Sequence, residues 1–238
     1  TANHNTAVGV SALKVNTTAS GNTAVGKSSL TANTTGASNT AVGKESLLAN
    51  TTANDNTALG FRAMCKTTTG CQNAAVGTNV MRQNTTGDLN VAIGYRALDA
   101  NTTADNNTAV GADSLLSNTT GTENTAVGSG ALDSNTTAGC NTSIGHGSMG
   151  DNTTGANNIA VGRNALGSNT TGSSNVAVGR GALVLNTTAT GNTGLGMNSL
   201  TANTTGANNV GVGWQALTSN TTASNNTAVG TLALSANT

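Results

Sequence analysis

Aliphatic residues recur along this chain at one fixed spacing. The segment Asn-Thr-Ala-Val-Gly, first met at residues 5–9, returns every 17 residues, unchanged or with substitutions at its three middle positions, so that fourteen units account for all 238 residues. We number each unit from that asparagine, which places Asn5 at position 1 and Gly21 at position 17. Position 4 is always Val, Ile or Leu, and position 9 is always Leu or Met. A strict period of this size predicts a solenoid, in which coils stack because a single coil cannot bury its own apolar side chains.

The polar positions complete the pattern. Positions 6, 7, 10, 11, 16 and 17 vary freely and carry every Lys, Arg, Asp and Glu, so we expect them at exposed corners of the coil. The segments between them are rich in Thr, Val and Ala and bounded by Gly and Asn, which favours short strands and turns over helix. Proline is absent, as expected of strands that donate hydrogen bonds to both neighbours. We therefore predict an all-β protein, a parallel β-solenoid of fourteen coils.

Some positions tolerate almost no change, and we predict that they form ladders along the stack. We expect the aliphatic residues at positions 4 and 9 to be the core and the invariant Gly at position 5 to mark a positive φ or a close backbone approach. In the first unit the predicted structural ladder consists of Asn5, Val8, Gly9, Leu13, Asn16, Thr17 and Thr18. We expect residues 1–238 to be one continuous repeat array of fourteen 17-residue coils, an excerpt of a longer fibre.

Position 3 is small in every unit, Ala in eleven and Ser143, Gly194 or Gly211 in the others. Successive strand residues point to opposite faces, so we expect position 3 to point away from the core residue at position 4. A side chain facing water would not need to be small. We therefore predict that an identical chain covers this face, most simply in a homotrimer, and that segments could also join end to end as a filament.

Composition narrows the classes of function. Only 8% of residues are charged and 1% are aromatic, which excludes an ordinary globular core. Nine Lys and Arg balance nine Asp and Glu, so bulk charge attracts neither nucleic acid nor an acidic membrane surface. No apolar run approaches the roughly 20 residues of a membrane span, and we expect no membrane insertion.

The residues that could carry chemistry are scattered over the corners. His4 and His146 fall at different corner positions about eight coils apart, and Cys65, Cys71 and Cys140 have no Cys-x-x-Cys spacing. Asp88 and Asp105 stack at position 16, but two carboxylates fall short of the six to eight oxygens that calcium prefers. We therefore predict no enzyme activity, no cofactor and no metal site. A disulfide between neighbouring protomers remains open.

Two other kinds of function stay open. Phe61, Tyr95 and Trp214 all lie at position 6 and could form a weak binding strip for glycans or a host-cell surface. The threonine ladders raise the alternative of ice binding, although Thr17 and Thr18 are adjacent and so face opposite sides, which leaves one exposed file. Loss of glycan binding on Trp214→Ala would favour the first alternative, and thermal hysteresis would favour the second.

Several segments resemble known repeat families. Residues 90–94, 158–162 and 175–179 are similar to the head repeats of trimeric autotransporter adhesins. Residues 94–98 and 213–217, each followed by Asn-Thr-Thr, resemble the arrays of phage tail-fibre-like and bacterial surface proteins, many of which end in an endosialidase-type chaperone domain. The resemblance implies a left-handed β-roll and trimeric packing. We expect a non-enzymatic structural fibre, a rigid extracellular or virion-borne shaft of an appendage, filament or adhesin.

Overall fold

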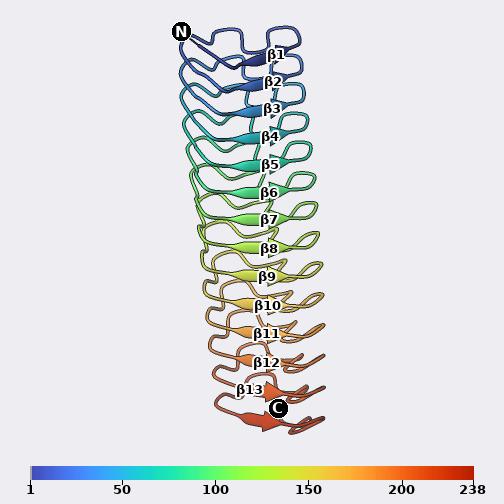
Figure 1. Ribbon diagram of the computed structural model, residues 1–238. Coiled ribbons are helices and arrows are strands. Elements are labelled where there is room, and N and C mark those ends of the chain that lie inside the picture. The colour runs from blue at the N-terminus through green and yellow to red at the C-terminus, as the bar shows by residue number, and fades with distance from the viewer. Residues whose placement is uncertain (1) are drawn as a thin grey trace. The chain divides into compact units, whose positions relative to one another are not determined.

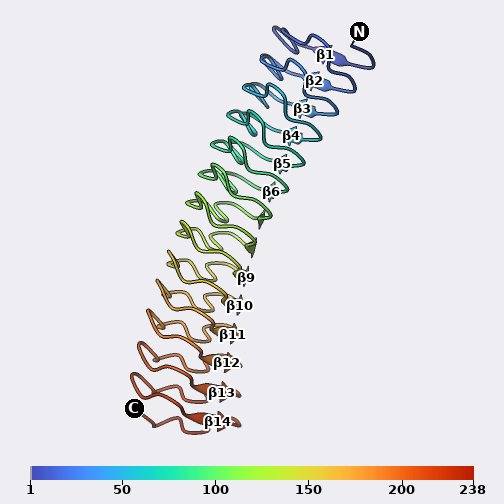
Figure 2. The ribbon, with the colours of Figure 1, turned by 90° about the vertical axis from the view of Figure 1, so that its left-hand side faces the viewer.

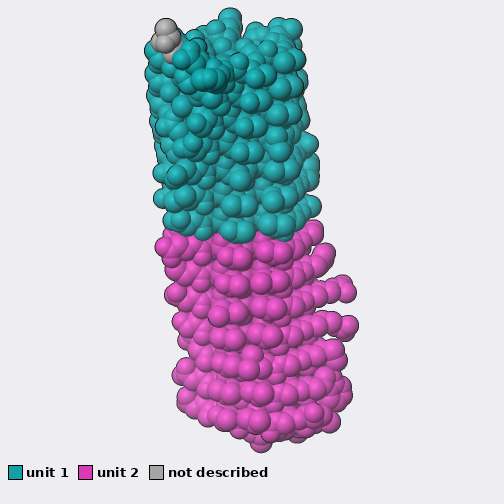
Figure 3. Space-filling view, viewed as in Figure 1, with its two compact units in different colours: residues 1–120 teal, residues 121–238 magenta. Residues whose placement is uncertain are grey.

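The computed structural model describes residues 2–238, which fall into two compact units, one up to residue 120 and one from residue 121 to residue 238 (Figure 3). The described residues contain β-strands and turns and no helix. Unit 1 contains the strands β1 (Thr6–Val8), β2 (Thr23–Val25), β3 (Thr40–Val42), β4 (Thr57–Leu59), β5 (Ala74–Val76), β6 (Val91–Ile93) and β7 (Thr108–Val110). Unit 2 contains β8 (Thr125–Val127), β9 (Thr142–Ile144), β10 (Ile159–Val161), β11 (Val176–Val178), β12 (Thr193–Leu195), β13 (Val210–Val212) and β14 (Thr227–Val229).

Each unit is a parallel β-solenoid, which confirms the predicted fold class. Every strand covers positions 2 to 4 of its coil and pairs in parallel with the strand 17 residues away, so that like position lies on like position (Figure 1). The pairing within unit 2 follows the same register. The strands of each unit therefore form one sheet along one side of its stacked coils (Figure 2).

The rest of each coil consists of turns, which are also joined to the neighbouring coils. In the coil that begins at Asn22, the N–H of Ser29 donates to the carbonyl of Gly26 at 3.4 Å, and Ser28 between them has a φ of 60°. A positive φ at the third residue is what a type II turn requires. Backbone bonds to the next coil follow at Leu30, whose N–H donates to Ser46, and at position 13. Hydrogen-bond ladders therefore run around the whole coil, although only three residues per coil are strand.

The interior of a coil is narrow and is filled by one large side chain and several small ones. In the second coil Ala24, Ser29 and Leu30 are fully buried at positions 3, 8 and 9. The twelve largest fully buried side chains among the described residues are all Leu or Met at position 9. One Leu or Met per coil is thus the main apolar filling, and stacking places each of them against the next.

Two files of buried asparagines connect the coils. The side-chain amides of Asn22 (position 1) and Asn33 (position 12) both donate to the carbonyl of Gly36 at 2.9 Å, which closes the coil across its interior. Each file also bonds along the stack, since the Asn22 N–H donates to Asn5 Oδ1 at 2.9 Å and Asn50 Nδ2 donates to Asn33 Oδ1 at 2.7 Å. Buried amides with these partners explain why position 1 never changes.

The glycine at position 5 is fixed for two reasons. Its φ lies between 128° and 140° in all fourteen units, a region that side chains rarely adopt. In addition, a Cβ on Gly94 would lie 2.6 Å from the carbonyl oxygen of Gly111 in the next coil. The coils can therefore approach closely only with glycine here.

The prediction that position 4 belongs to the core is wrong. In β3 Ala41 is fully buried while Val42 is 37% exposed, and in the first coil Val8 is 57% exposed. The two positions do lie on opposite faces, but the small residue points inward, because a 17-residue coil that already holds a Leu or Met and two asparagines has no room for a second large aliphatic. Position 3 is therefore small because it is inside, and not because another chain covers it.

Candidate interaction surface

The side of each sheet that points away from the coil is formed by positions 2 and 4, and we call it the outer sheet face. Position 2 is Thr in nine of the fourteen units and Ala, Val or Ile in the other five, and position 4 is Val, Ile or Leu throughout. No charged residue occurs at either position. Within each unit the register of the strands places these side chains in two straight files.

The outer sheet face is exposed in some coils and half-buried in others. Even between two paired neighbours, Ile93 at position 4 and Ile159 at position 2 are each 43% exposed, whereas Val25 and Val110 are half-buried. Each coil contributes a strip about 4.8 Å high and about 10 Å wide, so that seven coils present roughly 340 Å² of flat surface. Position 2 is mostly Thr, so the apolar part of this surface is the continuous aliphatic file at position 4, and exposed contiguous apolar surface often marks an interaction site. The face is therefore the leading candidate for a functional surface in each unit.

Charged side chains lie at the corners and are paired between coils in unit 1. Arg62 Nε lies 2.6 Å from Glu45 Oε2, and Arg82 Nε lies 2.9 Å from Asp99 Oδ1. In each pair the partners occupy the same position in neighbouring coils. The hydrogen bond from Arg62 holds the pKa of the Glu45 carboxyl below its ordinary value, and the bond to Asp99 raises the pKa of Arg82. The Arg62–Glu45 pair is largely exposed and adds little to stability, whereas Asp99 is buried beneath a half-buried Arg82.

The three aromatic residues do not form one site. Phe61 and Tyr95 lie two coils apart in unit 1, and Trp214 lies in unit 2. The Phe61 ring has Lys44 Nζ at 5.5 Å from its centroid and the Arg62 guanidinium at 5.1 Å, so cations already accompany it. Trp214 is 42% exposed, and in the described part of the chain no Lys or Arg side chain lies over its ring.

The cysteines are free and do not come together as a reactive group. Cys65 and Cys71 are half-buried in unit 1, and Cys140 is exposed in unit 2. Burial raises the pKa of the Cys65 thiol. The Cys140 thiol donates to Glu123 Oε2 at 3.4 Å, and this hydrogen bond to a carboxylate raises its pKa. Both effects favour the protonated, less nucleophilic thiol.

The remaining candidate residues, two aspartates and two histidines, contact the backbone or solvent. Asp88 Oδ1 accepts from the N–H of Cys71 at 2.6 Å, and Asp105 Oδ1 accepts from the N–H of Asp88 at 2.7 Å. Their carboxylates thus satisfy backbone donors of the preceding coil. His4 and His146 are exposed corner residues, and within residues 2–238 no three His, Cys, Asp or Glu side chains are grouped as a metal site would need.

The paired threonines behave as their adjacency predicts. Thr34 is half-buried and its hydroxyl donates to the carbonyl of Thr51 at 3.0 Å, whereas Thr35 is exposed. In the first coil Thr17 makes the same bond to the carbonyl of Thr34 at 3.0 Å, but both Thr17 and Thr18 are exposed there. One threonine file, at position 14, therefore faces water in each unit. The asparagine at position 12 is buried, as in Asn33, so the Asn-Thr-Thr runs serve packing.

The sequence pattern did not reveal the outer sheet face. It showed that position 4 is restricted to aliphatic residues, but that restriction was assigned to the core. The signal that could have corrected the assignment is the size of position 3, since a residue that tolerates Gly194 and Gly211 but nothing larger than Ser143 fits a tight interior. An aliphatic position that never accepts Lys or Glu, although it faces outward, is the feature that calls for a functional explanation.

Comparison with protein-family models finds no match to this chain, and comparison with curated proteins finds none either. The function therefore has to be argued from the surface itself. Within the described residues there is also no helix that is long and apolar enough to cross a membrane.

Proposed function

We propose that this chain is a non-enzymatic structural protein whose outer sheet face packs against the same face of other copies, in a homotrimeric shaft. The observation that carries the proposal is the unbroken aliphatic file at position 4, in which every side chain is half-buried or exposed in the single chain. Val42, Val76 and Val178 are 37%, 37% and 38% exposed, respectively. Water gives no reason to keep fourteen such positions free of polar residues, whereas burial against a partner does.

The most suitable occupant of this face is a second copy of the chain. Each file repeats at the spacing of the coils, about 4.8 Å, and only a partner with the same repeat can match it side chain for side chain over many coils. The face carries no charge, so two copies can approach without repulsion between like charges. Threefold closure buries the strip of every chain around one axis and leaves the charged corners in water.

The area of the outer sheet face determines how the strength of association depends on the number of coils. A standard protein interface buries about 800 Å² per partner, and a strip of about 48 Å² per coil reaches that value after roughly seventeen coils. Association should therefore strengthen with every coil that is added. This dependence suits a long shaft, whose stiffness comes from the backbone ladders and whose corners are free to vary.

The resemblance to tail-fibre-like and surface repeat proteins is compatible with this role and with an extracellular or virion-borne location, both of which remain proposals. The direct test is the mass of the chain in solution, measured by sedimentation velocity over a hundredfold range of concentration. We expect the mass of three chains at the upper end of the range. A single-chain mass at every concentration would overturn the proposal.

A further inference from the structure

Unit 2 has two arginines that differ from those of unit 1. In unit 1 Arg62, Arg82 and Arg96 each lie within 3.6 Å of a carboxylate oxygen in a neighbouring coil. Arg163 and Arg180 occupy position 6 of two successive coils in unit 2, and neither has an ion pair within the described residues. Residues 152–238 contain no Asp or Glu, and Asp151, in the coil before that of Arg163, forms no ion pair with it. Two stacked guanidinium groups thus remain without a counter-charge.

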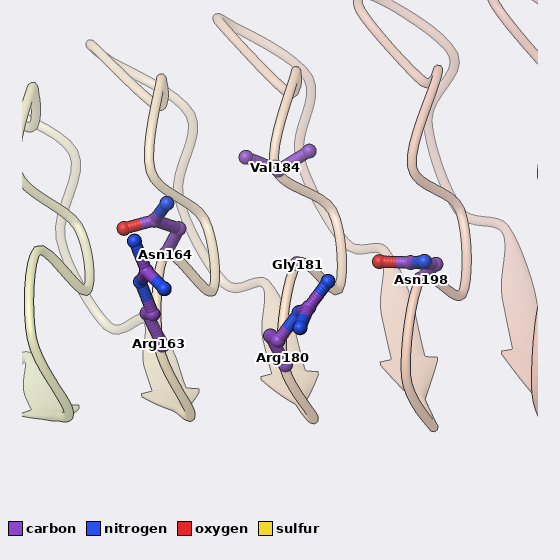
Figure 4. A pocket seen from close by; sticks show the side chains of 6 residues that line it. All are labelled: Arg163, Asn164, Arg180, Gly181, Val184 and Asn198. Atoms are coloured by element: carbon purple, nitrogen blue, oxygen red, sulfur yellow. The ribbon is translucent and has the colours of Figure 1, made fainter.

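The same two arginines line a hollow. It has a volume of about 300 Å³, and its walls are Arg163, Asn164, Arg180, Gly181, Val184 and Asn198 (Figure 4). The hollow lies where Gly181 contributes no side chain at position 7, between coils that carry Asn164 and Asn198, and the Asn198 amide reaches over it, since a Cβ on Gly181 would lie 2.7 Å from Asn198 Oδ1. In Figure 4 the guanidinium group of Arg163 lies beside Asn164 and that of Arg180 lies beside Gly181 in the next coil. Two cationic forks and amide groups therefore surround one small space.

Like charges one coil apart repel each other, and a bound anion would remove that repulsion. Guanidinium groups bind carboxylate, sulfate and phosphate through paired N–H donors, and one oxyanion can accept from two arginines at once. The space is at the lower limit of ordinary ligand pockets, which suits one such group and not a large apolar ligand.

Two exposed apolar side chains continue the same row of position 6. Met197 and Trp214 follow Arg180 at position 6 of the next two coils, and each is 42% exposed. Two coils correspond to about 10 Å along the stack. The flat apolar face of an indole can pack against the apolar face of a sugar ring. A short oligosaccharide whose acidic group occupies the hollow would reach Trp214.

We propose that Arg163, Arg180 and the hollow over Gly181 bind the oxyanion group of an acidic oligosaccharide, with Trp214 packing against a sugar ring further along the chain. The ligand class is a carboxylated or sulfated glycan. This site goes beyond the structural role of the outer sheet face and does not depend on it.

The test is a titration of the whole chain, followed by calorimetry, with a heparin-derived sulfated tetrasaccharide, with sialyllactose, with inorganic sulfate and with maltotetraose. We expect binding of at least one of the two acidic oligosaccharides, weaker binding of sulfate, and none of the uncharged maltotetraose. Whether the sulfated or the carboxylated sugar binds more tightly identifies the acidic group. The one Trp of the chain adds a fluorescence signal at the proposed site.

Variants locate the site. A charge-assisted hydrogen bond contributes about 1.5 to 3 kcal/mol, so each Arg→Gln should weaken binding by at least about tenfold and the double variant Arg163→Gln/Arg180→Gln by about a hundredfold or more. Arg62→Gln, which removes an arginine that is already paired, should change the affinity less than twofold. Trp214→Ala should weaken binding of the oligosaccharide but leave the affinity for inorganic sulfate unchanged.

A second pair of variants tests the hollow itself. Gly181→Asn places in the space a residue that the neighbouring coils already accept at a φ of 55° (Asn164) and 57° (Asn198). Its Cβ would lie 2.7 Å from Asn198 Oδ1, so the Asn198 amide must turn away, and binding should be abolished while the circular dichroism spectrum keeps its β-sheet form. Gly130→Asn is the control for the change of residue type at position 7 alone, because a Cβ at Gly130 meets nothing within 4 Å.

Three results would overturn the proposal. They are no binding of either acidic oligosaccharide by the wild-type chain, equal binding by the double arginine variant, and equal loss in Gly130→Asn and Gly181→Asn. Tighter binding of a DNA oligonucleotide that is insensitive to Trp214→Ala would overturn the assignment to a glycan.

Discussion

A lysine placed on the outer sheet face tests whether that face is buried between chains. Val178 lies in β11 between Val161 and Leu195 and is 38% exposed in the single chain. In a monomeric coil Val178→Lys would extend into water and cost little. In the proposed shaft the same ammonium group would lie at the axis, against its copies in the other chains.

The expected loss of association follows from two contributions. Fully burying a Val side chain is worth about 1.5 to 3 kcal/mol, so the exposed part of Val178 is worth about 0.6 to 1.1 kcal/mol per chain and about 2 to 3 kcal/mol in a trimer. Removing an ammonium group from water without a partner costs several kcal/mol per ion. The sum exceeds about 5 kcal/mol, which corresponds to a weakening of association by more than about a thousandfold.

The same coil offers a matched control. Leu185 lies at position 11, a corner, and is 47% exposed, so Leu185→Lys adds the same charge and removes a similar exposed aliphatic. Position 11 already carries Lys66 in another coil. Val178→Ile is the conservative variant, because Ile93 and Ile144 occupy position 4 elsewhere. We expect Leu185→Lys and Val178→Ile to assemble like the wild-type chain.

Sedimentation equilibrium gives the association constants, and circular dichroism reports whether each variant keeps the fold. If Val178→Lys assembled as tightly as Leu185→Lys, the outer sheet face would not be the contact between chains. A loss of the β-sheet spectrum in Val178→Lys alone would contradict the outward placement of position 4.

Three further predictions concern the coil itself. Gly94→Ala should lower the free energy of unfolding by at least about 3 kcal/mol, measured by urea denaturation, because alanine must adopt a strained φ and displace the next coil. Thr67→Asn should raise it by about 1 to 3 kcal/mol, because Thr67 Oγ1 and Asn50 Oδ1 are buried without hydrogen-bond partners and the amide would restore the asparagine file; an unchanged urea midpoint would contradict that role. Glu123→Gln should speed alkylation of Cys140 at pH 8, followed by peptide mass spectrometry, since the raised pKa of this thiol keeps it protonated and loss of the carboxylate lowers that pKa; an equal or slower rate would show that Glu123 does not control the thiol.

The period of the sequence was sufficient to predict the fold class. Invariant positions separated by 17 residues required stacked coils, and most of the freely varying positions do lie outside, although position 10 is largely half-buried and Asp99 there is buried. Gly94 and its equivalents were expected at a positive φ or a close approach, and the structure shows both at once. These features could be predicted because each is decided within a coil and repeated along the stack.

Which face of each strand points into the coil could not be predicted in the same way. Alternation assigns Ala41 and Val42 to opposite faces, but it does not say which face is inside. That choice depends on the interior volume left by Leu47 and the two asparagines, which is a property of the closed coil. The larger aliphatic was therefore placed in the core, where the structure has the smaller residue.

The hollow beside Arg180 could not be predicted from the sequence for a similar reason. The sequence indicates that Arg163 and Arg180 stack, and stacked like charges at a corner suggest only a solvated edge. The missing side chain of Gly181 becomes important when positions 6, 7 and 10 of neighbouring coils are seen to share one space.

The central claim is that the aliphatic file at position 4 is buried between identical chains. A cross-section of the assembled protein by electron cryomicroscopy, at a resolution that separates the coils, tests it most directly. We expect three chains around a common axis with their outer sheet faces turned toward it and the variable corners outside. A single coil per cross-section, or three coils that meet through their corners, would contradict the claim.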